Sequence, residues 1–265
     1  MSDAEMDVPW LRRAMLRAFR SRRRVLVAYS GGVDSGLVAK LAWDALGTDA
    51  LAVITDSESL SRRELSDATA AAAEIGIPLR VLRVSELASP GYAANPVNRC
   101  YFCRSGLAAV LTGIAAAGRF AAIADGIHAS DLGDVRPGIR AMDEAGFWHP
   151  LLESGLGKAE VRAMARAAGL SFWDKPSNAC LSSRIPHGTP ITIDLLRQVE
   201  AAEEVLRGRG FRQVRVRHHG ETARIQVAPE EIRELMAIRG DVEEAMRGLG
   251  FRSAVVDPDG YRSAA

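Results

Sequence analysis

A glycine turn suited to binding phosphates follows the first buried strand predicted in the chain. The strand is the continuous apolar run 25–28, and the turn reads Ser30-Gly31-Gly32-Val33-Asp34-Ser35. Two glycines let the backbone approach a ligand closely, and the helix that follows points its first N–H groups at an anion. Ser30 and Ser35 add hydroxyl donors, and Asp34 could hold a magnesium ion against the same phosphates. The Gly-x-x-x-x-Gly-Lys-Ser/Thr pattern of a Walker loop is absent. The turn therefore predicts a nucleotide-phosphate site of another kind, with a tight strand-to-helix turn as the purely structural alternative.

The three cysteines of the chain are the second feature that could support chemistry. They are Cys100, Cys103 and Cys180, and an odd, small number of cysteines argues against a disulfide framework. Three thiolates can hold three irons of a 4Fe-4S cubane and leave the fourth iron open. A structural zinc ion would want a fourth ligand, which His128 or His149 could supply. Buried thiols that only fill space are the structural alternative.

The phosphate turn resembles that of the PP-loop family, which cleaves ATP between its α- and β-phosphates and forms adenylates. Thr55-Asp56-Ser57, at the end of the second predicted strand, matches the segment that flanks adenine in that family. A loop start with helix-capping side chains is the equally weighted alternative there. The resemblance implies that the ATP-binding residues are Ser30, Gly31, Gly32, Val33, Asp34, Ser35, Thr55, Asp56 and Gly126.

Longer motifs narrow this resemblance and span nearly the whole chain. They are NRCYFCR (98–104), DGIH (125–128) with Asp131 and RPGIRA (136–141), KPSNACLSSRIP (175–186), RVRHH (215–219) and GYR (260–262). Together they resemble the LarE family of sulfur transferases, which serves the nickel-pincer nucleotide cofactor of lactate racemase. The resemblance implies adenylation of the carboxylates of pyridinium-3,5-biscarboxylic acid mononucleotide and their conversion to thiocarboxylates, with release of AMP and pyrophosphate.

The same resemblance assigns roles to the cysteines and to Asp34. Asp34 and Cys180 would be catalytic, with Cys180 handling the sulfur. One version of the family sacrifices the sulfur of that cysteine and leaves dehydroalanine. The other keeps three cysteines that bind a 4Fe-4S cluster carrying an extra sulfide from a sulfide donor. Because the chain has Cys100, Cys103 and Cys180, the cluster is the preferred interpretation, and sacrificial Cys180 or a zinc site stays open.

Arginines near the C-terminus indicate where a mononucleotide substrate could bind. Arg215 and Arg217 alternate along a predicted strand and therefore point to one face, and Arg212 precedes them. Guanidinium groups suit the phosphate of a mononucleotide. The resemblance implies the same substrate-binding role, whereas solvent-facing arginines are the structural alternative.

Alternating strands and helices must position these residues. Strands at 25–28, 50–55, 79–84 and 121–124 with helices at 35–46, 61–75, 104–117 and 158–168 predict an α/β fold with a parallel sheet and helices on both faces. Residues 85–103 are expected to be irregular, and 125–140 to form a loop. An α-β-β-α-β order at 193–207, 211–218, 222–228, 229–247 and 251–256 predicts a small α+β domain. The expected domains are 1–187, for ATP, and 188–265, for substrate binding or oligomerisation.

Composition limits the classes of partner. The formal net charge of +1 gives no sign of a polyanionic partner, so nucleic acid is not expected. No apolar run approaches the ~18 residues of a membrane span, and the acidic start of the chain is not a signal peptide. A cytoplasmic enzyme is expected, and family resemblance adds a homo-oligomer. The rival functions are a tRNA-thiolating PP-loop enzyme, for which the arginines between positions 12 and 24 would bind RNA, and a non-catalytic adenine-nucleotide-binding protein.

Overall fold

The computed structural model describes residues 7–133, 137–177 and 179–261 and divides the chain into two compact units. Unit 1 comprises residues 1–57, 62–84 and 98–175, and unit 2 comprises 58–61, 85–97 and 176–265. The expected limits of 1–187 and 188–265 remain a prediction. The units differ from them chiefly because two short segments of the N-terminal half join unit 2.

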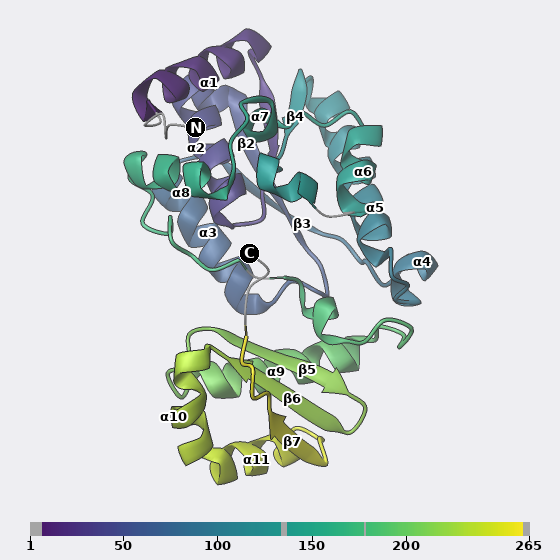
Figure 1. The fold of residues 1–265 in the computed structure, drawn as a ribbon. Helices are drawn as coiled ribbons and strands as arrows, with labels where there is room; N and C mark the ends of the chain where they lie inside the picture. The colour runs from purple at the N-terminus through teal and green to yellow at the C-terminus, as the bar shows by residue number, and fades with distance from the viewer. Residues whose placement is uncertain (1–6, 134–136, 178, 262–265) are drawn as a thin grey trace. The chain divides into compact units, whose positions relative to one another are not determined.

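Unit 1 is built on a four-stranded parallel sheet (Figure 1). Its strands are β1 (Val25–Ala28), β2 (Ala50–Asp56), β3 (Leu79–Arg83) and β4 (Ala122–Ala124), in the order β3-β2-β1-β4. Register pairs Val27 with Ala52 on one side and with Ala124 on the other. All four residues of β1 are buried, as a central strand covered on both faces requires. The predicted α/β fold is confirmed.

Helices cover both faces of this sheet. On one side lie α1 (Val8–Arg22), α2 (Val33–Leu46) and α8 (Lys158–Ala167), and on the other lie α5 (Arg99–Gly118) and α6 (Pro137–Glu144) (Figure 1). The remaining helices are α3 (Arg62–Ile75), which contacts α2, and the short α7 (Pro150–Glu153). The core between the sheet and α5 includes Leu26, Ile123 and Leu111. The apolar strands β1, β2 and β4 pack against the buried faces of the helices. The resulting layered core holds the strand ends in place.

The cysteine segment differs from the expectation. Residues 85–103 were expected to be irregular, but α4 (Pro90–Ala93) forms within them and α5 begins at Arg99. Cys100 and Cys103 therefore lie in the first turns of a helix, not in a loop. The reason is local: the twenty residues that follow Asn98 contain no proline, so the helix extends back to Arg99 even though the Asn98 side chain makes no capping hydrogen bond. In the expected loop 125–140, a short 3-10 helix (Ala129–Gly133) and the start of α6 likewise form.

One described helix, α5, is long and apolar enough to cross a membrane by length and composition alone. This qualifies the expectation that no segment approaches the length of a membrane span. The hydropathy of α5 comes mainly from Leu107, Val110, Leu111 and Ile114, with a smaller contribution from its alanines. A single helix of this kind is weak evidence, because core helices pass the same test.

Unit 2 contains a three-stranded mixed sheet packed against helices. The strands are β5 (Val214–His219), β6 (Thr222–Val227) and β7 (Ser253–Val256); β5 and β6 are antiparallel, and β6 and β7 are parallel. Alternate residues of β5 and β6 are buried against α9 (Ile193–Arg207) and α11 (Arg239–Gly248). Strand β5 begins later than expected and leaves Arg212 outside it. The expected helix 229–247 is divided into a 3-10 turn (Pro229–Glu231), α10 (Ile232–Ala237) and α11, because the backbone leaves helical geometry at Ile238.

Candidate active site

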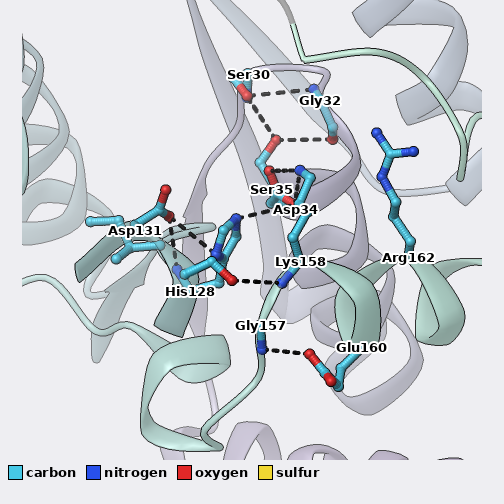
Figure 2. Close-up of polar contacts among 12 residues, drawn as sticks. Ser30, Gly32, Asp34, Ser35, His128, Asp131, Gly157, Lys158, Glu160 and Arg162 are labelled. Carbon is cyan, nitrogen blue, oxygen red and sulfur yellow. Dashed lines mark hydrogen bonds and ion pairs between the residues drawn. The ribbon is translucent and has the colours of Figure 1, made fainter. Parts of the chain in front are cut away.

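The phosphate turn lies at the carboxyl end of β1 and leads directly into α2. The hydroxyls of Ser30 and Ser35 are 3.0 Å apart, and the Ser35 hydroxyl also accepts a hydrogen bond from the Ser30 N–H at 3.1 Å (Figure 2). Gly31 has a φ of +75°, and a Cβ there would lie 2.3 Å from the Cβ of Ala68. Only glycine fits this position, since both the dihedral angle and the contact with α3 exclude a side chain. The turn is thus a fixed backbone bend with two hydroxyls at a helix N-terminus, where anions bind favourably.

Asp34, in the first turn of α2, forms an ion pair with Lys158 at the start of α8. The Lys158 ammonium lies 2.6 and 2.8 Å from the two carboxylate oxygens of Asp34 (Figure 2). Both side chains are partly exposed, at 27% and 32%. This places a carboxylate and a cation together beside the phosphate turn, within reach of a ligand bound there.

His128 flanks this ion pair on the side of β4. Its Nε2 lies 3.9 Å from an Asp34 carboxylate oxygen, and its Nδ1 lies 3.5 Å from Asp131 (Figure 2). The backbone N–H of His128 donates to the Asp131 carboxylate at 3.1 Å, which fixes the turn after β4. Within the described ranges, the buried Nδ1 has no hydrogen-bond partner. His128 therefore lies between two carboxylates, those of Asp34 and Asp131.

The carboxyl ends of the neighbouring strands bring the other predicted nucleotide residues to the same edge of the sheet. Thr55 and Asp56 end β2, next to β1, and Asp56 pairs with Arg62 at 2.6 Å. Gly126 follows β4 on the other side of β1, where a Cβ would lie 2.7 Å from the Ser35 nitrogen and 2.9 Å from the Asp34 carbonyl carbon. Parallel strands place ligands at this edge. The residues expected to bind ATP are therefore neighbours at one edge of the sheet.

The donor set at the turn fits a magnesium ion that arrives with its nucleotide. No group of three or more His, Cys, Asp or Glu side chains able to hold a metal occurs in the part of the chain that the structure describes. Magnesium, however, often uses only one or two protein carboxylates together with substrate phosphates and water. Asp34 could be such a carboxylate once its ion pair with Lys158 opens. Lys158 would then be free to contact phosphate.

The three cysteines are divided between the units. Cys100 and Cys103 lie three residues apart on α5 in unit 1, and neighbouring turns of a helix bring such residues to one face. Cys180 belongs to unit 2, directly before the 3-10 turn Leu181–Arg184. None of them forms a disulfide. Thiolates of this number and type fit the chemistry of an iron–sulfur cluster.

The backbone around Cys180 is anchored within unit 2 by a buried ion pair that the sequence did not reveal. Arg184 and Glu203, each 1% exposed, pair at 2.7 Å. Arg184 also donates to the carbonyl oxygen of Cys180 at 3.1 Å, and Glu203 accepts from the Val216 N–H of β5 at 3.1 Å. The Arg207 guanidinium adds a second cation at 2.9 Å from Glu203. This network joins the cysteine loop to the strand that carries the predicted substrate arginines.

We expect Glu203→Gln to destabilise unit 2 strongly. Breaking a buried ion pair leaves uncompensated charge, which typically costs about 3–5 kcal/mol. Here two arginines would lose their carboxylate. Urea denaturation should show a lower midpoint with an unchanged slope. Glu204→Gln is the matched control, because the neighbouring Glu204 is 39% exposed and also bonds to Arg207; equal losses in both variants would contradict the role of burial.

The predicted substrate arginines lie on one face of the small sheet, with one exception. Arg215 stacks over Tyr261, with its guanidinium 4.3 Å from the ring centre, and donates to the Tyr261 hydroxyl at 2.9 Å. Arg217 donates to Gln226 of β6 at 3.0 Å. Burial first, then the nearby Arg184, lowers the pKa of Arg215. Its buried Nε has no hydrogen-bond partner among the residues that are described. Arg212 is exposed and precedes β5, so it lies outside the alternating pattern.

The sequence predicted the phosphate turn and offered Lys158 as a residue that could face the ATP phosphates, but it did not predict the ion pair of Lys158 with Asp34. Three contacts join residues that are not neighbours in the sequence. They are the ion pairs Lys158–Asp34 and Arg184–Glu203 and the stacking of Arg215 on Tyr261. The local signals for these contacts were a lysine at the start of a predicted helix and arginines within the sequence motifs. Of the motif residues, Arg136, Asn178 and Arg262 lie outside the described residues.

Comparisons with known proteins find relatives that match nearly the whole chain. Residues 8–92, which contain the phosphate turn, match the NAD synthase family. The chain is 37% identical over 250 residues to pyridinium-3,5-bisthiocarboxylic acid mononucleotide synthase of Lactiplantibacillus plantarum, covering 94% of this chain and 91% of that enzyme. It is 45% identical over 242 residues to an uncharacterized protein of Synechocystis, covering 91% and 90% of the two chains. Similarity along nearly the full length includes both units.

Proposed function

Because the chain belongs to the LarE family of ATP-dependent PP-loop sulfur transferases, we propose that it adenylates the carboxylates of pyridinium-3,5-biscarboxylic acid mononucleotide and converts them to thiocarboxylates. AMP and pyrophosphate are the other products, and the thiocarboxylated nucleotide serves nickel-pincer cofactor synthesis for lactate racemase. The relative from Lactiplantibacillus plantarum is named for the bisthiocarboxylic acid product. This agreement with the motif-based expectation supports the substrate.

The phosphate turn is the observation that carries the proposal. It combines a helix N-terminus, two serine hydroxyls, and a carboxylate and an ammonium beside them. N–H groups and cations stabilise the charge that develops on pyrophosphate as it leaves. Bound magnesium would neutralise phosphate charge there. Asp34 is its proposed ligand, and Thr55, Asp56 and Gly126 line the same strand edge.

The proposed sulfur site uses Cys100, Cys103 and Cys180 as thiolate ligands of a 4Fe-4S cluster, whose open iron would hold sulfide from an external donor. Cysteine chemistry supports this, since three soft ligands leave one iron site available. Sacrifice of the Cys180 sulfur and zinc binding remain the rivals. We further propose a cytoplasmic homo-oligomer without nucleic-acid partners.

Formation of thiocarboxylate from purified protein tests the proposal. Protein purified without oxygen should convert the biscarboxylic acid mononucleotide when MgATP and sulfide are present, and should form AMP and pyrophosphate in equal amounts. A tRNA-thiolating enzyme would instead consume ATP only with tRNA. A nucleotide-binding protein would form neither product. Mass spectrometry of the mononucleotide distinguishes these outcomes.

Arg215→Ala and Arg217→Ala should each weaken mononucleotide binding by roughly ten- to a hundredfold, because a charge-assisted hydrogen bond is typically worth ~1.5–3 kcal/mol. ATP affinity should barely change. Calorimetric titration with each ligand measures both effects. Arg252→Ala is the control, because its side chain is 79% exposed and forms an ion pair with the exposed Glu221. Equal losses of ATP and mononucleotide affinity would assign these arginines a structural role instead.

A further inference from the structure

We propose that His149 is a positioning residue for ATP: clamped between Asp125 and Asp143, it holds the turn 125–128 against the phosphate turn. The inference rests on the proposed ATP function and adds a residue that lies outside the phosphate turn. The His149 clamp, defined as Asp125, His149 and Asp143, lies wholly within unit 1. Its members come from the turn after β4, the start of α7 and the end of α6.

The geometry of the clamp requires both ring nitrogens to donate. His149 Nδ1 lies 2.7 Å from a carboxylate oxygen of Asp125, and Nε2 lies 2.9 Å from a carboxylate oxygen of Asp143. A neutral imidazole has one N–H, so one of these contacts would set a lone pair against a carboxylate. The imidazolium satisfies both. His149 is therefore charged in this arrangement.

The electrostatic surroundings of His149 agree with that protonation state. Burial by itself lowers the pKa of His149, but the hydrogen bonds and charges of Asp125 and Asp143 outweigh it and raise the pKa above its usual 6.5. Asp125 from the turn and Asp143 from α6 are the charged groups that face the ring. A histidine with a raised pKa keeps its proton to a higher pH than a free imidazole does.

The backbone next to His149 extends the sheet beside β4. Trp148 bridges to Ala124 in parallel, and the N–H of Asp125 donates to the Trp148 carbonyl at 3.1 Å. His149, the N-cap residue of α7, therefore lies next to Asp125, which its ring contacts. The backbone that carries the His149 ring is therefore held by the sheet rather than by a surface loop.

Asp125 connects the His149 ring to the turn 125–128, which contacts the phosphate turn. The carboxylate oxygen that binds His149 also accepts the Ile127 N–H at 3.1 Å, which shapes the turn 125–128. Within that turn, Gly126 approaches Asp34 and Ser35 so closely that any Cβ would collide with their backbone. A shift of the turn by a few tenths of an ångström would therefore disturb the helix N-terminus that binds phosphate.

The buried carboxylate of Asp125 depends on the imidazolium. Asp125 is 5% exposed, and its second oxygen has no hydrogen-bond partner in the described ranges. A buried carboxylate needs a nearby opposite charge. When His149 loses its proton, Asp125 loses this neighbouring positive charge. The turn should then rearrange.

The pH dependence follows with a definite sign. Because the folded-state pKa of His149 is raised, its stabilising contribution is complete below about pH 6.5, the unfolded value, and is lost as the pH rises through the folded-state pKa. ATP affinity should decline over the same interval. In the wild-type protein we expect a loss of about five- to tenfold between roughly pH 6 and pH 9, within the usual range of coupling between sites.

The experiment compares wild-type protein with His149→Gln, using calorimetric titration with MgATP across this pH range. The difference between the two profiles is decisive, because ATP and other side chains also titrate. The variant should bind ATP about five- to tenfold more weakly at pH 6 and should lack the additional decline. In steady state its KM for ATP should rise while kcat changes little. Asp143→Asn should show a smaller loss, and His187→Gln, at an exposed position in unit 2, should behave as wild type.

A nuclear magnetic resonance titration of the His149 ring in nucleotide-free wild-type protein keeps the inference testable if the variant folds poorly. Its midpoint should exceed 6.5 and coincide with the decline in ATP affinity. Matching profiles for wild type and variant would overturn the inference, as would lower stability with unchanged ATP affinity. Absence of ATP binding by wild-type protein at every pH would overturn the proposed function and this inference together.

Discussion

Asp34→Ala should reduce pyrophosphate formation by about a hundredfold to a thousandfold, the loss typical when a transition state loses a major electrostatic partner. Asp34 lies at the N-terminal turn of α2, beside the serine hydroxyls of the phosphate turn, and its carboxylate is partly exposed. It is thus the side chain best placed to hold magnesium on the ATP phosphates. The variant loses that ligand and leaves the Lys158 ammonium without its carboxylate.

The measurement is pyrophosphate release with MgATP and the biscarboxylic acid mononucleotide, alongside thermal unfolding. Asp44→Ala is a matched control on the same helix. Asp44 pairs with Lys40 and Arg12, each at 2.6 Å, near the far end of α2. Partly exposed pairs of this kind contribute about 0–1 kcal/mol each. Its activity should stay near the wild-type value. Wild-type rates from folded Asp34→Ala would remove the mechanism proposed for the phosphate turn.

Asp34→Asn separates the size of the side chain from its charge. The amide keeps the size of the side chain but has no charge for Lys158 or for magnesium. In the structure, both carboxylate oxygens contact the ammonium, so the proposed magnesium ion would compete with Lys158 for the same group. In the proposed site, ATP would remove this competition, because its phosphates would offer the ammonium another anion. The nucleotide and its cation should therefore bind as one complex rather than separately.

The local parts of the fold could be predicted because their signals are local. The strand before the phosphate turn is an apolar run, the turn contains the glycine that its +75° φ demands, and α2 follows at once. The parallel sheet then follows from alternating strands and helices. Likewise, the carboxyl ends of β2 and β4 bring Asp56 and Gly126 to the same edge as the turn.

The remaining parts depend on contacts that no short segment encodes. Lys158 and Asp34 are 124 residues apart, and His149 and Asp125 are 24 apart. An alternating pattern fixes the face of a strand on which Arg215 lies, but not the tyrosine on which it stacks. The start of α5 was misplaced for a different reason. Pro90, Gly91 and Pro96 suggested a loop up to Cys103, yet helix breakers act only on their immediate neighbours.

Variants of the three cysteines test most clearly where the transferred sulfur comes from. If three thiolates hold a cluster, Cys100→Ser, Cys103→Ser and Cys180→Ser should each lose bound iron and nearly all thiocarboxylate formation, because a missing ligand leaves the cluster incomplete. Ser105→Ala, on the same helix as Cys100 and Cys103, is the control and should retain both. Iron and sulfide analysis after anaerobic purification, together with the absorption spectrum, measures cluster content.

Sacrificial chemistry predicts a different pattern from the same variants. The Cβ–Sγ bond of Cys180 would break after its sulfur has bonded to the adenylated carboxylate, and the Cα proton would leave to form dehydroalanine. The protein would lose about 34 Da, the mass of hydrogen sulfide, and could turn over only once. Only Cys180 would then be required. Cys100 and Cys103, in the first turns of α5, would be dispensable.

Intact-protein mass spectrometry before and after the reaction distinguishes the two mechanisms. With excess sulfide and MgATP, the cluster mechanism predicts many thiocarboxylates per protein molecule and an unchanged mass at Cys180. The helical placement of Cys100 and Cys103 favours this result, because residues three apart on a helix present both thiols to the same side. Stoichiometric dehydroalanine at position 180, with full activity in Cys100→Ser and Cys103→Ser, would instead establish the sacrificial route and leave the cysteine pair on α5 without a role in sulfur transfer.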